Sequence, residues 1–452
     1  MMRARWLALV VASVGAGALS CRPSARPAPK PEPAAASPAI PPSSVAGPEP
    51  EDPPPRPLRR CFPDQPEWQD APVADLLDRA GKLFDADDFE GALACSEEAA
   101  RQAPRSVEAH HDRAAALLHL GKIDDGRDAL ALALALDPDD TETLEASADL
   151  FINQLPASAD RSAIGLEHAR RAFRRAVGHD RSRAARLGLL EGQALIDLGR
   201  SEEAVGRLTV SLSLAPKLDA ALYEKGVALF ELCRFTEARR TFERVAPSSS
   251  DRAHAVYHLA LIEERQDRER DAQDHFAEAN ERDPAAFPVP PSVSASEFAE
   301  RVRRIVSELP EDVRTDLTQA HLETAELPAL DDLIAEKPPL SPTILGLFRG
   351  LPIGFEAEVD SRSAPATRGA KGRRAANTTG SAAPSAAGTD SSPLGPTQCG
   401  PNDRAIVLYR RNLLRSVRDV AALDEAIRRT LLHEVGHLRG EDDGSLRDRG
   451  LE

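Results

Sequence analysis

Two histidines and a glutamate in one short run have the residue types and the spacing of a metal centre. His433, Glu434 and His437 form an H-E-x-x-H run. On a helix, residues four apart lie on the same face, so both imidazoles can reach one ion. Glu434 follows the first of them and can act as a general base toward water at that ion. A catalytic Zn²⁺ site has three protein ligands and one open position, so one more ligand is needed.

The third ligand is expected just beyond the end of the helix. Gly440 can adopt the left-handed conformation that ends a helix and turns the chain back. Asp443 lies six residues after His437 and fits the spacing H-E-x-x-H-x-x-G-x-x-[HD], with Asp442 as its near rival. The alternative is a chance motif on an amphipathic helix with solvated histidines, and the added Gly and Asp lower its odds.

The segment before the histidines has the pattern of the helix that must present them. Asp419 or Asp424 can cap it, and apolar residues follow at helical spacing: Val420, Leu423, Ile427, Leu431 and Val435. Residues 405–409 form a short β-rich run ahead of it. A strand followed by the metal helix is therefore expected here.

Composition bounds the remaining possibilities. The 452 residues suggest two or three domains, and a hydrophobic fraction of 41% with only 4% aromatics favours close helix packing. The formal net charge of -16 argues against a nucleic-acid partner.

The beginning of the chain has the features of a targeting segment. Arginines precede a short apolar run at 6–19, which is too short for a comfortable membrane span. The run ends in Ala18-Leu19-Ser20-Cys21, which resembles the lipobox of bacterial lipoproteins, with an ordinary secretory signal as the alternative. The resemblance implies a signal peptide at 1–21, lipidation of Cys21, and attachment to a membrane surface through that lipid.

Export places the expected protein in the cell envelope, facing the periplasm or the outside. Arg22, rather than Asp, follows Cys21, which by analogy favours the outer membrane if the cell is Gram-negative. Residues 22–60 are rich in Pro, Ala and Ser and are predicted to be a disordered tether.

Residues 72–285 repeat with a fixed period. Pro104 and Pro138, 34 residues apart, each close an Ala-rich helix pair. Gly121, Gly199 and Cys233 fall at the expected turns between paired helices. About six units are expected, the third of them irregular, with a longer inter-helix loop around 156–165.

This period, with small residues at the helix contacts, resembles tetratricopeptide repeats. Such units bury their apolar faces only by stacking, which implies an α-solenoid with a concave groove. The resemblance implies a protein or peptide partner in that groove, although no groove residue identifies one. His254 and His258 are also four apart, but they lack an intervening Glu and a nearby acidic ligand, and ordinary packing is expected there.

Residues 294–452 have a different composition. They contain, in order, SEFAERVRRIVSELPEDV, LGLFRGLPI, DRAIVLYRRNLLR and RRTLLHEVGHLRGEDDGSL. The stretch 361–398, rich in Ser, Ala, Gly and Thr, is predicted to be a disordered insertion. In combination these segments resemble the small bacterial zincin-like metallopeptidases called minimal zincins.

The resemblance implies a small α+β domain with zinc bound by His433, His437 and Asp443, and with Glu434 as the general base. By analogy with zincins, residues 405–409 would be the edge strand along which an extended substrate pairs. Two departures are the long insertion and the residues Leu438 and Arg439, where aromatic or His residues are common.

These expectations combine into a mainly α chain: a tetratricopeptide-repeat solenoid followed by a small α+β zincin-like domain. The expected function is that of an exported, lipid-anchored zinc metallopeptidase with a repeat scaffold for partners or clients. The alternative is a non-catalytic repeat scaffold whose metal domain is degenerate or structural. Four cysteines follow Cys21; no C-x-x-C pair occurs among them, and a pairing of Cys61 with Cys399 is only a guess.

Overall fold

The computed structural model describes Cys61, residues 71–354 and residues 404–451. The expected signal peptide, Cys21, the tether, Cys399 and the insertion 361–398 lie outside the described residues. The chain divides into two compact units, one reaching to Ala221 and the other beginning at Leu222. The boundary therefore falls inside the repeats.

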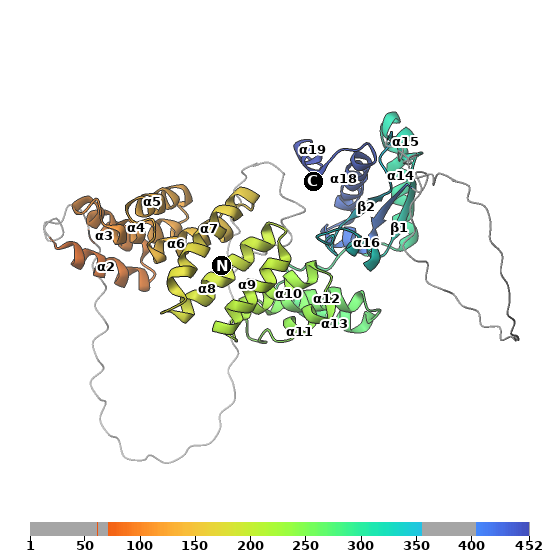
Figure 1. The fold of residues 1–452 in the computed structure, drawn as a ribbon. Coiled ribbons are helices and arrows are strands. Elements are labelled where there is room, and N and C mark those ends of the chain that lie inside the picture. The colour runs from red at the N-terminus through yellow and green to blue at the C-terminus, as the bar shows by residue number, and fades with distance from the viewer. Residues whose placement is uncertain (1–60, 62–70, 355–403, 452) are drawn as a thin grey trace, which may run out of the picture. The chain divides into compact units, whose positions relative to one another are not determined.

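Helix pairs fill the described chain up to residue 282 (Figure 1). Six pairs are present there, as the 34-residue period predicts: α2(Val73–Asp85) with α3(Phe89–Gln102), α4(Val107–His119) with α5(Ile123–Leu136), α6(Thr141–Asp149) with α7(Ala159–Ala176), α8(Arg181–Asp197) with α9(Ser201–Leu214), α10(Asp219–Glu231) with α11(Phe235–Phe242), and α12(Arg252–Glu264) with α13(Glu269–Arg282). Small residues pack the pairs closely, since Ala99, Ala133, Ala204 and Ala238 are fully buried. The predicted mainly α repeat architecture is confirmed.

The turns inside the pairs have a common backbone conformation. Gly121, Gly199 and Cys233 have φ of 74°, 69° and 57°, in the left-handed region. Asp87 and Asp267 occupy the same place in the first and last pairs, with φ of 58° and 56°. Gly avoids the steric cost of this conformation, whereas Asp and Cys bear it.

The third unit departs from the regular pattern in another way than expected. After α6 the chain continues in a π-helical turn, Leu150–Gln154, before α7 begins at Ala159. Gly165 therefore lies within α7, and the prediction of a loop reaching to it was wrong. A Cβ at Gly165 would lie 2.4 Å from Ile152 Cγ1. The absence of a side chain at Gly165 therefore lets the wide π-helical turn pack against α7.

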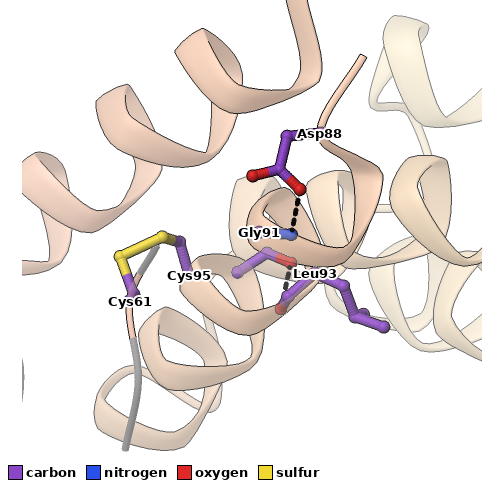
Figure 2. The surroundings of a disulfide bond; sticks show 6 residues. Cys61, Asp88, Gly91, Leu93 and Cys95 are labelled. Carbon is purple, nitrogen blue, oxygen red and sulfur yellow. Dashed lines mark hydrogen bonds between the residues drawn. A yellow bond between two sulfur atoms is a disulfide. The ribbon is translucent and has the colours of Figure 1, made fainter. Parts of the chain in front are cut away.

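A disulfide joins Cys61 to Cys95 in α3 (Figure 2). Both cysteines are fully buried and belong to the core of the first two helix pairs, with Leu76 and Leu83 of α2. In the same helix, Asp88 caps α3 by accepting from the Gly91 N–H at 3.0 Å. The guessed pairing of Cys61 with Cys399 was wrong, while Cys233 is a free thiol.

The rest of the described chain forms a small α+β fold. Its helices are α14(Ala295–Glu308), α15(Glu311–Leu317), α16(Leu330–Ala335), α17(Arg410–Arg415), α18(Val420–Leu438) and α19(Asp443–Asp448), and its strands are β1(His321–Ala325), β2(Gly346–Arg349) and β3(Ala405–Tyr409). The strand order is β1-β3-β2, with β1 parallel and β2 antiparallel to β3. In the register Leu322 pairs with Ile406, and Phe348 pairs with the same residue from the other side.

One apolar core holds the metal-motif helix against this sheet. Ile406 and Leu408 of β3 belong to a cluster with residues of α14 and α18: Phe298, Val302, Ile305, Leu423, Ile427, Leu431, Val435 and Leu438. Ser294 caps α14 in a reciprocal capping box with Glu297. Helix α18 is thus buried along one side, which fixes the direction of its other side chains.

The last helix pair makes charged contacts with this fold inside the second unit. Arg411 donates to Glu264 at 2.6 Å and to Glu326 at 2.9 Å, and Arg415 also pairs with Glu264. Arg265 donates to the carbonyls of Pro328 and Pro342 at 2.9 and 2.8 Å. The repeat helices therefore support the segment that leads into β2. Within the described residues, no helix has the length and apolarity that crossing a membrane requires.

Candidate metal centre

Helix α18 presents both histidines of the motif on one side. Asp419 is its N-cap and accepts from the Ala422 N–H at 2.8 Å, so Asp424 is not the cap. The Nε2 atoms of His433 and His437 lie 3.0 Å apart. The i, i+4 spacing has therefore brought two nitrogen donors to one point, as the motif predicts.

The chain turns back after α18 at the predicted glycine. Gly440 has φ of 88°, and the Glu441 N–H donates to the Gly436 carbonyl at 2.9 Å. The turn leads into α19, whose first residue is Asp443. Its Oδ1 lies 3.3 Å from His437 Nε2 and 3.8 Å from His433 Nε2.

The structure separates the two candidate aspartates. Asp442 is the N-cap of α19 and accepts from the Ser445 N–H at 2.8 Å. Among the described residues, His433, His437 and Asp443 form the group with metal-ligand geometry, their ligand atoms all within 4.8 Å of one another. Asp443 is thus the aspartate that faces the histidines.

The glycine inside the motif explains how α19 can come so close. A Cβ at Gly436 would lie 2.2 Å from Leu446 Cδ2, and Leu446 is fully buried. The absent side chain lets α19 pack on α18, and Asp443 is carried to the histidines by that packing. The spacing of the motif did not reveal this role.

The hydrogen bonds of the imidazoles indicate a cation site. His433 Nδ1 lies 2.9 Å from the Leu451 carbonyl, and His437 Nδ1 lies 3.0 Å from the Glu441 carbonyl. A carbonyl only accepts, so both Nδ1 atoms carry the proton and a neutral ring directs the lone pair of Nε2 inward. Two lone pairs and a carboxylate oxygen then converge, an arrangement that a cation stabilises. Tetrahedral ligands about 2.0–2.1 Å from one zinc ion are about 3.3 Å apart, and these residues fit that spacing.

Glu434 follows His433 on α18 and contacts the sheet. Its side chain is buried, and the Phe348 N–H of β2 donates to its carboxylate. Burial raises the pKa of the Glu434 carboxyl to about 8, although the Phe348 hydrogen bond acts in the opposite direction. A Cβ at Gly346 would lie 2.9 Å from Glu434 Oε1, so this glycine is what allows β2 to approach the site.

The expectation that 405–409 is an edge strand was wrong. β3 is the central strand, and β2 is the edge strand that contacts Glu434. The Tyr409 N–H donates to the Leu345 carbonyl at 2.9 Å. Since backbone direction alternates along a strand, the main-chain groups of Gly346 and Phe348 point away from β3, consistent with the Phe348 hydrogen bond.

Three other polar residues of this fold have defined places. Strand alternation puts Tyr409 on the sheet face opposite Ile406 and Leu408, and Arg410 donates to Glu326 and to the Val293 carbonyl. Arg439 pairs with Asp312 and Asp316. Both arginines are therefore paired with carboxylates of other segments.

The other histidine pairs serve packing. His258 is buried, stacks on Phe242 with ring centroids 5.1 Å apart, and places its Nδ1 2.9 Å from the His254 carbonyl. His110 Nε2 lies 3.0 Å from the Pro104 carbonyl, and His111 Nδ1 lies 3.3 Å from Thr143 Oγ1.

Two parts of the chain match known protein families. A tetratricopeptide-repeat model matches residues 77–141, 189–253 and 223–287, and a zincin-like metallopeptidase model matches residues 384–451. The chain joins tetratricopeptide repeats to a zincin-like domain. The zincin-like match contains His433, Glu434, His437 and Asp443. Tetratricopeptide repeats are typically protein- or peptide-binding scaffolds.

Solved structures with similarity to the chain include several repeat proteins. PilF of Pseudomonas aeruginosa is 14% identical, with 47% of this chain and 92% of that chain covered and a TM-score of 0.41. PilW, a type IV pilus biogenesis factor, is 18% identical, with 47% and 94% covered and a TM-score of 0.41. YrrB, described as a repeat protein with an unusual peptide-binding site, is 16% identical, with 42% and 93% covered and a TM-score of 0.34. No curated protein matches the chain.

Proposed function

We propose that the zincin-like domain is a zinc-dependent peptidase and that the repeats hold its protein partners or clients. The observation that carries this proposal is the convergence of His433 Nε2, His437 Nε2 and Asp443 Oδ1 beside Glu434. These three residues would hold zinc, which supplies a Lewis acid that polarises a peptide carbonyl and activates water.

Glu434 is the proposed proton carrier. It follows His433 on the same helix, and its carboxylate takes a proton from the attacking water and gives it to the leaving amine. In this structure the carboxylate accepts from the Phe348 N–H. That N–H is released to a substrate carbonyl when an extended peptide lies along the outer edge of β2.

The test compares zinc content with hydrolysis of an unstructured protein such as casein. Glu434→Gln is expected to retain zinc and to lower the rate by about 10²–10⁴-fold, because it removes the proton acceptor but no ligand. His433→Ala, the matched control, loses both zinc and activity. Full activity in Glu434→Gln would contradict the mechanism. A zinc-loaded chain that cleaves nothing would favour the non-catalytic scaffold.

We also propose export with a lipid anchor at Cys21. Support comes from the lipobox-like sequence and from the Cys61–Cys95 disulfide, since structural disulfides persist in oxidising compartments outside the cytoplasm. A Cys21→Ser variant is expected to lose incorporation of a labelled fatty acid in a bacterial host. Equal labelling of both chains would refute the anchor at this position.

A further inference from the structure

The chain beyond α19 returns to the metal helix. The Gly450 N–H donates to the Arg447 carbonyl at 2.9 Å, and the Leu451 N–H donates to the Leu446 carbonyl at 3.0 Å. Gly450 has φ of 73°, the left-handed conformation that reverses the chain direction. The Leu451 backbone is therefore held in a defined place beside α18.

The carbonyl held there faces a metal ligand. Leu451 O lies 2.9 Å from His433 Nδ1, although the two residues are 18 positions apart. The other ligand histidine takes its acceptor, Glu441 O, from the turn directly after α18. The two histidines thus depend on different parts of the segment after the helix, and His433 depends on its far end.

We propose that the main-chain carbonyl of Leu451 is a positioning group for His433. It holds the proton on Nδ1, fixes the plane of the ring and so keeps Nε2 directed at the point that Asp443 and His437 also face. Outer acceptors of this kind typically change metal affinity by 10–100-fold. The inference rests on the metal site of the proposed function. It assigns a role in that site to the segment after α19, which contributes no ligand side chain.

The experiment measures Zn²⁺ affinity by competition with a chromophoric chelator. The full chain is compared with a chain that ends at Gly450 and with a chain that lacks only Glu452. The chain ending at Gly450 is expected to bind Zn²⁺ at least about ten-fold more weakly, because the acceptor is gone. The chain lacking Glu452 keeps an oxygen acceptor on Leu451 and is expected to stay within about two-fold of the full chain.

A second readout does not involve the metal. Nitrogen-15 NMR of the metal-free chain at a pH where the imidazole is neutral is expected to show His433 protonated on Nδ1. Ending the chain at Gly450 is expected to move a large fraction of the proton to Nε2. Gly450→Val provides the same test without shortening the chain, since a β-branched residue opposes the left-handed conformation and displaces Leu451. Thermal unfolding identifies any variant that fails to fold.

The outcomes distinguish the inference from the function on which it rests. A full chain that binds no Zn²⁺ overturns both. A full chain that binds Zn²⁺, with unchanged affinity and an unchanged His433 tautomer in folded variants, overturns only the role of Leu451. Weaker binding together with the tautomer change supports the role, and weaker binding without that change contradicts it.

Discussion

In the repeats the same contact is made many times, whereas in the zincin-like domain each contact that shapes the site is made once. The left-handed turn recurs at Gly121, Gly199 and Cys233. The ligand set, in contrast, needs two turns of one helix and the start of another, α19. Changes in the repeats should therefore act on stability, and changes near the motif should act on ligand geometry.

The largest expected effect tests the first half of this comparison. Leu130 of α5 is almost completely buried in the core of the first unit. Leu130→Ala leaves a cavity and should lower the free energy of unfolding by about 2–5 kcal/mol, measured by urea titration. Zinc affinity should not change. A large loss of zinc affinity in this variant would show that packing in the repeats also affects the geometry of the metal site.

Asp442 and Asp443 test whether changes near the motif act on ligand geometry. Asp443→Asn weakens a charged ligand and should lower zinc affinity by about ten-fold or more, or about 1.4 kcal/mol. Asp442→Asn keeps an N-cap side chain, because Asn caps as well as Asp, and should leave zinc affinity nearly unchanged. The reverse result would assign the ligand to Asp442.

The histidine pair of the repeats, His254 and His258, allows a test of stability by pH. Burial lowers the pKa of His258 to about 4, whereas an unfolded histidine titrates near 6.5. The unfolded chain therefore binds the proton first as the pH falls, so stability is unaffected above pH 6.5 and is lost between 6.5 and 4. At pH 5 the loss is about 2 kcal/mol.

His258→Phe keeps a ring against Phe242 and removes this titration. Urea unfolding at pH 7.5 and pH 5 should show a smaller loss of stability in the variant than in the parent chain, by about 2 kcal/mol. Equal losses in both chains would mean that His258 does not cause the acid sensitivity of the second unit.

Local patterns in the sequence were sufficient for the elements and for the grouping of His433, His437 and Asp443. The strand Ala405–Tyr409 and the turn at Gly440 were predicted because β-forming composition and glycine conformation are properties of short segments. Asp443 required only a spacing. Residue types carried the information in each case.

The sequence did not reveal the main-chain contacts of the site or the pairings between segments far apart in the chain. Two contacts of the site are made by main-chain groups, the Leu451 carbonyl and the Phe348 N–H. Nearly every residue has such groups, so the residue types do not reveal which ones take part. The central place of β3 depends on which strands pair with it, and those come from far apart in the chain. The Cys61–Cys95 bond likewise joins a residue outside the repeating pattern to one inside it.

That disulfide also determines how force enters the folded protein. A pull along the chain from before Cys61 reaches α3 through a covalent bond and does not have to pass through α2. Without the bond, α2 would be the first helix to bear the load and to peel from the stack. With the bond, the tension acts on α3, which packs against both α2 and α4. A helix held by two neighbours resists being pulled away better than a helix at the end of the stack.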